Sequence, residues 1–309
     1  MIKIDKLSKQ FGPFVAVDNL SFTVQEGEVL GFLGPNGAGK STTMKMITGF
    51  LSPTKGKVTV CDYDIAQDAL AAKRLIGYLP EGAPCYGDMT CASFLNFIAE
   101  IRGFQKVERK QRIQQVVEQL ELQQVYHKSI DTLSKGFKRR VGLAQAIIHD
   151  PKVLILDEPT DGLDPNQKYQ VRDLIKNLSQ DKIVIISTHI LEEVSAVCTR
   201  AMIIAHGKLL ADGTPDELAA KSPHHKAVTL RIEKGEGALE ALSELSQVSE
   251  VKEIDGGRAL LVIPKPNQQV YSAVSELVQQ RAWTVDELFV QKGHLDEVFR
   301  QITVGSVAP

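Results

Sequence analysis

Residues 34–41 read GPNGAGKS, a glycine-rich octet that indicates how this part of the chain folds. It matches the phosphate-binding pattern G-x-x-x-x-G-K-[ST], with an apolar run, EVLGFLG (28–34), before it and a predicted helix after it. Glycines let the backbone wrap closely enough for successive N–H groups to face a phosphate at the positive end of the following helix. Lys40 adds a charge for the β- and γ-phosphate oxygens, and Ser41 adds a hydroxyl for Mg²⁺. We therefore predict a nucleotide site formed by Gly34, Pro35, Asn36, Gly37, Ala38, Gly39, Lys40, Ser41 and Thr42.

A second element, VLILDEP at 153–159, is an apolar strand that ends in two carboxylates. In α/β folds the carboxyl ends of the strands form the edge at which ligands bind. We expect Asp157 to hold Mg²⁺, directly or through water, and Glu158 to act as a general base that aligns and polarises the attacking water. A chance glycine-rich turn and a solvated pair of acids are the alternatives if each motif is taken alone.

The segment LSKGFKRRVGLAQA (133–146) places Ser134 where it can cap a helix that starts at Lys135 or Gly136. A capped helix start beside a glycine can bind an anion, because unpaired N–H groups and the helix dipole favour negative charge there. Taken alone, the same segment also fits a plain N-cap without a ligand.

The order of predicted elements changes along the first two thirds of the chain. Short β-rich runs fill the first 80 residues, among them VTVCDYD (58–64), with one helix after Lys40. Helical spacing at 93–124 indicates a helical insertion. Between 133 and 215, nearly continuous apolar strands alternate with helices, which predicts a parallel sheet covered on both faces.

The last third predicts a separate small domain. Segment 216–226 is polar and contains Pro223, so we expect a linker there. The order β-α-β-β-α-β over 228–290, followed by a short helix at 294–302, is the split βαβ or ferredoxin-like pattern.

Composition excludes several classes of protein. A length of 309 residues suggests about two domains, and 43% apolar residues exclude disordered and fibrous chains. Thirty-six Lys and Arg against 38 Asp and Glu leave a net charge of −2, without the basic excess of a dedicated nucleic-acid binder. The four cysteines form no CxxC pair and are expected to be reduced thiols. No signal peptide and no run of ~18 apolar residues is present, which predicts a cytoplasmic chain.

Together these motifs resemble the ATP-binding subunit of ABC (ATP-binding cassette) transporters, in the order in which that family carries them. LSKGF (133–137) matches the cassette signature, Asp164 in TDGLD matches the D-loop, and His189 in STH matches the switch histidine. Phe11 falls where the family places an aromatic ring against adenine. Taken alone, such a Phe would more often be a core residue and such a His a surface residue.

The resemblance implies a P-loop α/β cassette at residues 1–220, with a mixed sheet core and a helical subdomain at about 82–132, followed by a small α+β ferredoxin-like domain at 227–309. It implies a Mg²⁺-dependent ATPase in which Glu158 and His189 are catalytic. The implied Mg²⁺ ligands are Ser41, Asp157 and Glu81. Outside the phosphate loop, the implied ATP contacts are Phe11, Glu81, Ser134, Lys135, Gly136 and Asp164.

The resemblance also implies a head-to-tail dimer, either a homodimer or a heterodimer with a second cassette. Ser134 and Gly136 then act in trans, on ATP held by the phosphate loop of the other subunit. Because the γ-phosphate satisfies donors on both subunits, ATP holds the dimer closed and hydrolysis removes the bridge. His189 is expected to contact the γ-phosphate and to orient Glu158 and the water.

Three residues depart from the best-known family pattern. Glu81, in IGYLPEGAP, stands where many cassettes have Gln; its oxygens can still reach Mg²⁺ or water, but it adds negative charge near the phosphates. A plain surface Glu is the alternative. Lys135 and Phe137 replace the Gly and Gln of the signature LSGGQ. All three are similar to a bacterial subgroup that serves ABC-2 type permeases, and the closing HLDEVFRQIT is similar to the small appended domain of that subgroup.

The resemblance therefore implies an exporter subunit that couples ATP-driven dimerisation to a separate integral-membrane ABC-2 type permease, peripheral on the cytoplasmic face of the cell membrane. Apolar residues of the helical insertion are candidates for the permease groove, although core packing is the favoured role for most of them: Met89, Phe94, Phe97 and Ile98. The alternative is a non-transport cassette ATPase that acts on ribosomes or DNA. Such proteins usually hold two cassettes or a long coiled coil, and neither is present, so no nucleic acid is expected as a partner.

Overall fold

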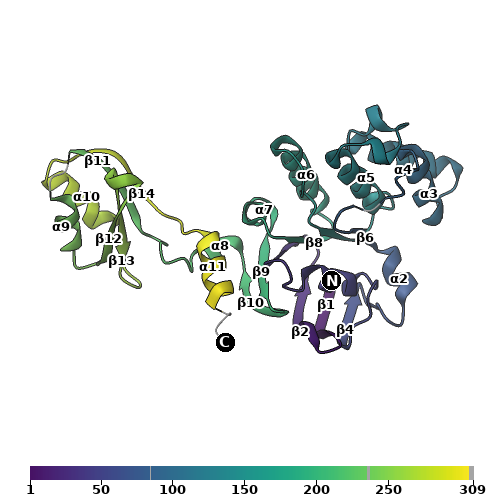
Figure 1. The fold of residues 1–309 in the computed structure, drawn as a ribbon, viewed down its shortest axis with the longest axis horizontal. Helices are drawn as coiled ribbons and strands as arrows, with labels where there is room; N and C mark the ends of the chain where they lie inside the picture. Colours follow the sequence, from purple (N-terminus) through teal and green to yellow (C-terminus); the bar gives the residue numbers. More distant parts are fainter. Residues whose placement is uncertain (84, 235–236, 306–309) are drawn as a thin grey trace. The chain divides into compact units, whose positions relative to one another are not determined.

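The computed structural model describes residues 1–309 except 84, 235–236 and 306–309, and it divides into two compact units, Met1–Pro215 and Asp216–Pro309 (Figure 1). The segment that we expected to be a linker begins with a short helix, α8 (Pro215–Ala219). Pro at the start of a helix and acidic residues in its first turn favour helix formation, which explains this difference.

A four-stranded antiparallel sheet opens the first unit, in the order β2-β1-β4-β5. Its strands are β1 (Ile2–Phe11), β2 (Phe14–Val24), β4 (Lys55–Val60) and β5 (Tyr63–Asp64). The sequence suggested one β-rich run over 58–64, whereas the structure turns the chain at Cys61 and Asp62, whose φ angles are 46° and 71°. Two successive positive φ angles give the tight turn that suits a two-residue hairpin.

A six-stranded sheet forms the centre of the first unit, in the order β10-β9-β3-β8-β7-β6. Its strands are β3 (Val29–Leu33), β6 (Ile76–Leu79), β7 (Val153–Asp157), β8 (Ile183–Thr188), β9 (Arg200–Ala205) and β10 (Lys208–Gly213). The pairs from β9 to β6 are parallel, and β10 joins the edge antiparallel. Every residue of β3, β7 and β8 is buried, which confirms the parallel sheet predicted from their apolar runs.

Two hydrophobic cores cover the two faces of this sheet. Leu154 and Leu156 of β7 belong to the core shared with the helical insertion, whereas Val153 and Ile155 belong to the core shared with the antiparallel sheet. This alternation follows from the period of two residues in a strand. The predicted covering of both faces is therefore confirmed, and on one face the cover includes a second sheet.

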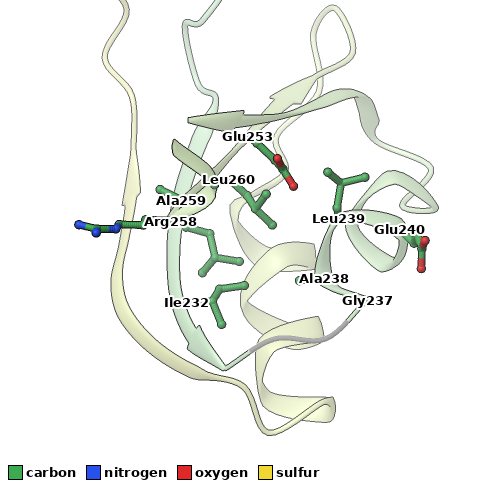
Figure 2. Close-up of a pocket in the computed structure, with 11 residues that line it drawn as sticks. Ile232, Gly237, Ala238, Leu239, Glu240, Glu253, Arg258, Ala259 and Leu260 are labelled. Carbon is green, nitrogen blue, oxygen red and sulfur yellow. The ribbon is translucent and has the colours of Figure 1, made fainter. Parts of the chain in front are cut away.

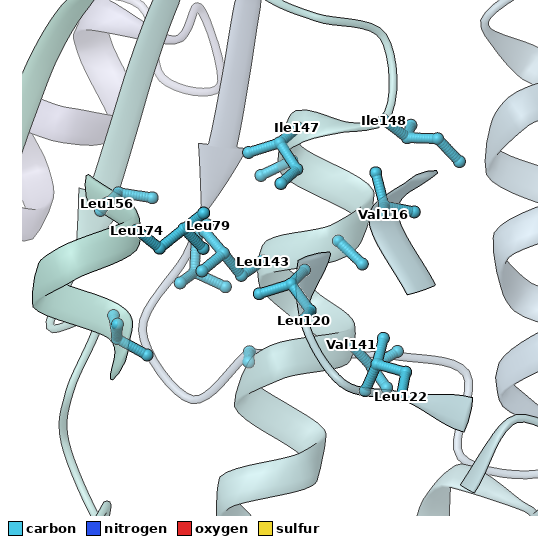
Figure 3. Packing of buried hydrophobic residues seen from close by; sticks show 14 of the residues in the cluster. Leu79, Val116, Leu120, Leu122, Val141, Leu143, Ile147, Ile148, Leu156 and Leu174 are labelled. Carbon is cyan, nitrogen blue, oxygen red and sulfur yellow. The ribbon is translucent and has the colours of Figure 1, made fainter. Parts of the chain in front are cut away.

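In the first unit, the insertion helices α3 (Cys91–Ile101) and α4 (Lys106–Gln119) pack against α5 (Lys135–Ile147). The unit also contains α1 (Lys40–Ile47), α2 (Ala69–Arg74), α6 (Pro165–Leu178) and α7 (Leu191–Val197). Figure 3 shows Val116 and Leu120 of the insertion packed beside Leu143 and Ile147 of α5. The helical insertion that spacing predicted is thus joined to the core of the unit through α5. Among the described residues, no helix has both the length and the apolarity to cross a membrane.

The second unit has the predicted β-α-β-β-α-β order and the sheet order β12-β13-β11-β14, with antiparallel neighbours. Its elements are β11 (Val228–Lys234), α9 (Ala238–Ser243), β12 (Val248–Ile254), β13 (Ala259–Pro264), α10 (Tyr271–Gln280), β14 (Thr284–Val290) and the closing helix α11 (Leu295–Gly305). This strand order is that of a ferredoxin-like fold.

A pocket of about 310 Å³ lies between α9 and the sheet of the second unit (Figure 2). Ile232 and Leu260 form its apolar part, while the side chains of Glu240 and Arg258 point away from it. In the described ranges of both units, no group of three or more His, Cys, Asp and Glu residues is placed to hold a metal ion.

Candidate functional site

The phosphate loop connects β3 to α1 and is fixed at its end by a glycine. Gly39 has φ 100°, and a Cβ atom there would lie 2.5 Å from the carbonyl oxygen of Ala16, so no other residue fits without a backbone shift. Lys40 is buried, and its Nζ donates to the carbonyl oxygens of Gly34 and Pro35 at 2.7 and 3.3 Å. The charge of Lys40 is therefore held within the loop. Among the remaining loop residues, three are exposed, namely Pro35, Asn36 and Gly37. Ala38 is buried, and Ser41 and Thr42 are half-buried.

Asp157 ends β7 and is fully buried. Its Oδ1 accepts a hydrogen bond from the Ser187 hydroxyl, and its Oδ2 has no hydrogen-bond partner within the described part of the chain. Asp157 and Ser41 line the same cavity, which has a volume of about 920 Å³. A buried carboxylate oxygen without a partner, together with a nearby hydroxyl, is a donor set that fits a hard cation such as Mg²⁺.

Glu158, the next residue, is held between two basic groups. Nδ1 of His189 lies 2.9 and 3.0 Å from the two carboxylate oxygens, and Nζ of Lys40 lies 3.9 Å from Oε1. A carboxylate oxygen accepts in such a contact, so Nδ1 of His189 is the donor, and Nε2 points away from Glu158 across the imidazole ring. The Glu158 side chain is 10% exposed and that of His189 is 48% exposed. The backbone of Glu158 is left-handed, with φ 51°, a conformation that costs about 1–3 kcal/mol and is concentrated at functional sites.

Glu81 follows β6, which pairs with β7, and so it reaches the same edge of the sheet as Asp157. Glu81 lines the cavity that Ser41 and Asp157 also line. Burial raises the pKa of the Tyr78 hydroxyl, and the negative charges of Asp157 and Glu81 raise it further. The structure therefore places Glu81 among the acidic residues of the site.

The carboxylates of Asp157, Glu158 and Glu81 also affect the pKa of Lys40. Burial lowers the pKa of the Lys40 ammonium, while Glu158, Asp157 and Glu81 counteract this shift. Lys40 is thus a buried cation whose charge is stabilised by three acidic groups at the ends of two neighbouring strands, β6 and β7.

The signature and the D-loop form a second group of residues. Ser134 caps α5, accepting from the N–H of Phe137 at 3.4 Å, and Asp164 caps α6, accepting from the N–H of Gln167 at 2.9 Å. Gly136 is buried against the amide of the Gln167 side chain, and a Cβ atom at Gly136 would overlap that amide. Two capped helix starts therefore lie together, with Ser134 and Asp164 exposed to solvent.

Two further residues predicted for the site lie on exposed surfaces. Phe11 is at the tip of the β1–β2 hairpin, is 48% exposed, and has Nζ of Lys9 5.1 Å from the centroid of its ring. Lys135 is the exposed first residue of α5, and its side chain lies beside Gly162 of the D-loop.

Sequence reasoning missed several residues that support the site. Ser187 lies opposite Asp157 in the parallel pairing of β7 and β8, a register that the sequence alone does not reveal. Gln167 lies three residues after the cap Asp164, a position whose side chain commonly returns to the helix start. Gln145, which donates to the carbonyl oxygen of Tyr78 at 2.7 Å, carried no comparable signal.

A parallel sheet with a glycine-rich loop after β3, carboxylates after β7, a histidine after β8 and a helical insertion defines an ATP-binding cassette. The family model for the ABC transporter family matches residues 17–161. The chain belongs to the ABC transporter ATP-binding proteins.

The chain is similar to curated and solved members of this family. It is 38% identical over 240 residues to the uncharacterized ABC transporter ATP-binding protein YxlF of Bacillus subtilis (strain 168), covering 78% of this chain and 80% of that protein. It is 36% identical over 222 residues to the linearmycin resistance ATP-binding protein LnrL of the same organism, covering 72% of this chain and 71% of that protein. A solved ATP-binding subunit of an ABC transporter is 27% identical, with a TM-score of 0.66 over 72% of this chain and 92% of that one.

Proposed function

We propose that the chain is the Mg²⁺-dependent ATPase subunit of an ABC-2 type exporter, which couples ATP-driven dimerisation to a separate permease. The observation that carries this proposal is the Glu158 carboxylate, which is held by His189 at 2.9 Å beside the buried Asp157 and Lys40. A base fixed next to a phosphate loop can take the proton of an attacking water. The result of that step is ATP hydrolysis.

The residues of the site divide the work of this reaction. Lys40 and the loop N–H groups bind the β- and γ-phosphates of the substrate ATP, and Glu158 orients the water and accepts its proton. His189, through Nδ1, fixes the Glu158 carboxylate, and its Nε2, which points away from Glu158, would contact the γ-phosphate. Ser41 and Asp157, with Glu81 as an additional candidate, would hold Mg²⁺, which when bound neutralises charge on the phosphates.

The signature surface supports action in trans. Ser134 caps α5 with an exposed side chain, and Asp164 does the same for α6. The starts of two adjacent helices offer N–H groups and a positive dipole end to an anion on another molecule. We therefore propose a head-to-tail dimer, formed with a second copy or a second cassette, in which Ser134, Lys135 and Gly136 contact ATP bound to the other subunit.

A groove on the first unit supports a membrane partner. Two adjoining cavities of about 920 and 760 Å³ share Phe50, Tyr78 and Ile98 in their linings. At their margins Phe50 is 79% exposed and Leu70 is 78% exposed, and large apolar side chains grouped around a cavity mark a protein interface. We propose that a cytoplasmic helix of the permease docks at the Phe50 and Leu70 end of this groove, away from the Ser41 and Asp157 end that belongs to the ATP site. Docking there would keep the chain at the cytoplasmic face of the membrane.

The four apolar residues that sequence analysis suggested for this groove have different environments. Phe94 and Ile98 line it, although Phe94 is also buried in the core. Met89 is partly buried against the core, and the ring of Phe97 packs edge-on against Tyr86 at 5.7 Å. The name of the linearmycin resistance relative is consistent with export of a drug-like cargo, but the cargo is chosen by the permease.

The ATPase proposal is tested with Glu158→Gln, which keeps the shape of the side chain and removes the base. We expect the wild-type protein to hydrolyse ATP with Mg²⁺, and the variant to lose turnover by about 10²–10⁴-fold while forming a stable dimer with ATP in gel filtration. Glu192→Gln is the matched control, since the Glu192 side chain is 87% exposed on α7. A Glu158→Gln protein that stays monomeric with ATP and keeps wild-type turnover would refute the assignment.

The partner proposal is tested by membrane recruitment. We expect the chain to co-sediment with membranes only when an ABC-2 type permease is co-expressed, and Phe50→Glu to abolish this by placing a charge in the groove. Tyr169→Glu is the control, because Tyr169 is a 71% exposed aromatic residue on α6 outside the groove. Equal recruitment to membranes without a permease would favour the non-transport alternative.

A further inference from the structure

Arg139 of α5 is a buried cation that the proposed mechanism does not use. It is 4% exposed, and its Nη1 has no hydrogen-bond partner in the part of the chain that the structure describes. Its Nη2 lies 3.8 Å from Oδ2 of Asp161, whose side chain is 63% exposed. A guanidinium keeps its charge in proteins, so its burial requires negative charge nearby.

The face of α5 that carries Arg139 points toward the segment that bears Glu81. Gly142, one turn further along, packs against Ala83 and Leu79: a Cβ atom at Gly142 would lie 2.8 and 2.9 Å from their side chains. Residues three apart share a face of a helix, so Arg139 extends this contact toward the start of α5. Arg139 thus lies between the turn after β6 and the D-loop.

The charges around Arg139 are those of the ATP site. Burial lowers the pKa of the Arg139 guanidinium, and four carboxylates counteract that shift. They are Asp161, Glu158, Asp157 and Glu81. Three of these four also act on Lys40, so the acidic residues of the site face one buried cation on the phosphate side and a second on the α5 side.

We propose that Arg139 is a positioning residue that offsets the negative charge of Glu81 and the neighbouring carboxylates and holds the D-loop through Asp161. This inference rests on the proposed ATPase function for its kinetic consequences. The physical reason is that an acidic residue at position 81 adds to the repulsion between Asp157 and Glu158, and a buried guanidinium compensates for it. Asp161 is the strongest of the four carboxylate partners, and Glu81 adds to the negative charge that Arg139 offsets.

The first test is a double-substitution cycle in the metal-free protein, measured as thermal unfolding in EDTA. Arg139→Gln is expected to lower Tm by about 5 °C or more, because carboxylates lose a buried counter-charge. Adding Glu81→Gln is expected to recover part of this loss, although Glu81→Gln alone does not stabilise the wild type. The proposal is overturned if Glu81→Gln changes Tm by the same amount in the wild type and in the Arg139→Gln protein.

The second test uses the same variants in the ATPase assay. Arg139→Gln is expected to lower kcat about tenfold with little change in the KM for ATP, and the double variant to come within about threefold of Glu81→Gln alone. Arg139→Lys, which keeps the charge and loses the planar fork, is expected to retain most of the turnover. An Arg139→Gln protein with wild-type kcat, or an Arg139→Lys protein as impaired as Arg139→Gln, would contradict a role based on charge.

Lys138→Gln serves as the matched control. Lys138 is the preceding cation on α5, is 35% exposed, and lies 3.9 Å from Asp131. Lys138→Gln is expected to leave both Tm in EDTA and kcat unchanged. If the wild type shows no ATPase activity, the proposed function fails, whereas the unfolding cycle still decides whether Arg139 and Glu81 compensate each other.

Discussion

Removal of the Ser187 hydroxyl tests whether the site is built around an under-bonded Asp157. In Ser187→Ala, Oδ1 of Asp157 would lose the hydrogen bond that it accepts from the Ser187 hydroxyl. This carboxylate is fully buried, and its Oδ2 already lacks a partner among the described residues. A hydrogen bond to a charged group contributes about 1.5–3 kcal/mol to stability. For a unit of this size, that loss corresponds to a decrease in Tm of roughly 3–12 °C.

The assay compares unfolding in EDTA with unfolding in excess Mg²⁺ and ATP. We expect the loss to be largest in EDTA, because a cation bound at Asp157 would replace part of the missing interaction, and ligands that bind only the folded state stabilise it. Ser179→Ala is the control, since the Ser179 hydroxyl donates to the carbonyl oxygen of Lys176 on the exposed end of α6. A Ser187→Ala protein whose Tm in EDTA lies within about 1 °C of the wild-type Tm would refute the reasoning.

Three further predictions follow from the same structure. Gly39→Ala is expected to abolish ATP binding and to destabilise the fold by about 2 kcal/mol or more, because its Cβ atom would lie 2.5 Å from the Ala16 carbonyl oxygen; isothermal titration with ATP and urea unfolding would detect both effects. His189→Ala is expected to lower kcat by about 10²–10⁴-fold while changing KM little, because Glu158 loses the group that fixes it, and steady-state kinetics would separate the two constants. Burial, aided by the charge of Arg102, lowers the pKa of His149 to about 4 from 6.5, so the unfolded state binds a proton that the folded state does not. Stability is therefore expected to fall as the pH falls from 6.5 to 4, and His149→Gln should flatten this part of the pH profile in urea unfolding.

The phosphate loop and the strand ends could be predicted because their signals are local. Gly39 and Lys40 belong to a short pattern with a fixed backbone geometry, and Asp157 follows an unbroken apolar strand. Sheet order and the contacts between distant segments leave no such signal. The pairing of Asp157 with Ser187, and the burial of Arg139 beside Asp161, depend on which strands and loops become neighbours.

Local turn chemistry explains the smaller differences. Cys61 and Asp62 adopt positive φ angles that are uncommon for residues other than glycine, so the run over 58–64 looked continuous. No side-chain hydrogen bond caps the start of the short helix α2 (Ala69–Arg74), and the sequence did not predict this helix.

Helix α5 is a rigid connection between the signature residue Ser134 and the helical insertion. Its 13 residues correspond to a rod of about 20 Å, with the exposed Ser134 at one end and Ile147 packed against the insertion at the other. A tilt of about 5° around one end would move the other end by about 2 Å, which exceeds the distance tolerance of a hydrogen bond. Slight strain applied to the insertion would therefore suffice to engage or release an anion at Ser134, without any change in the fold of either region.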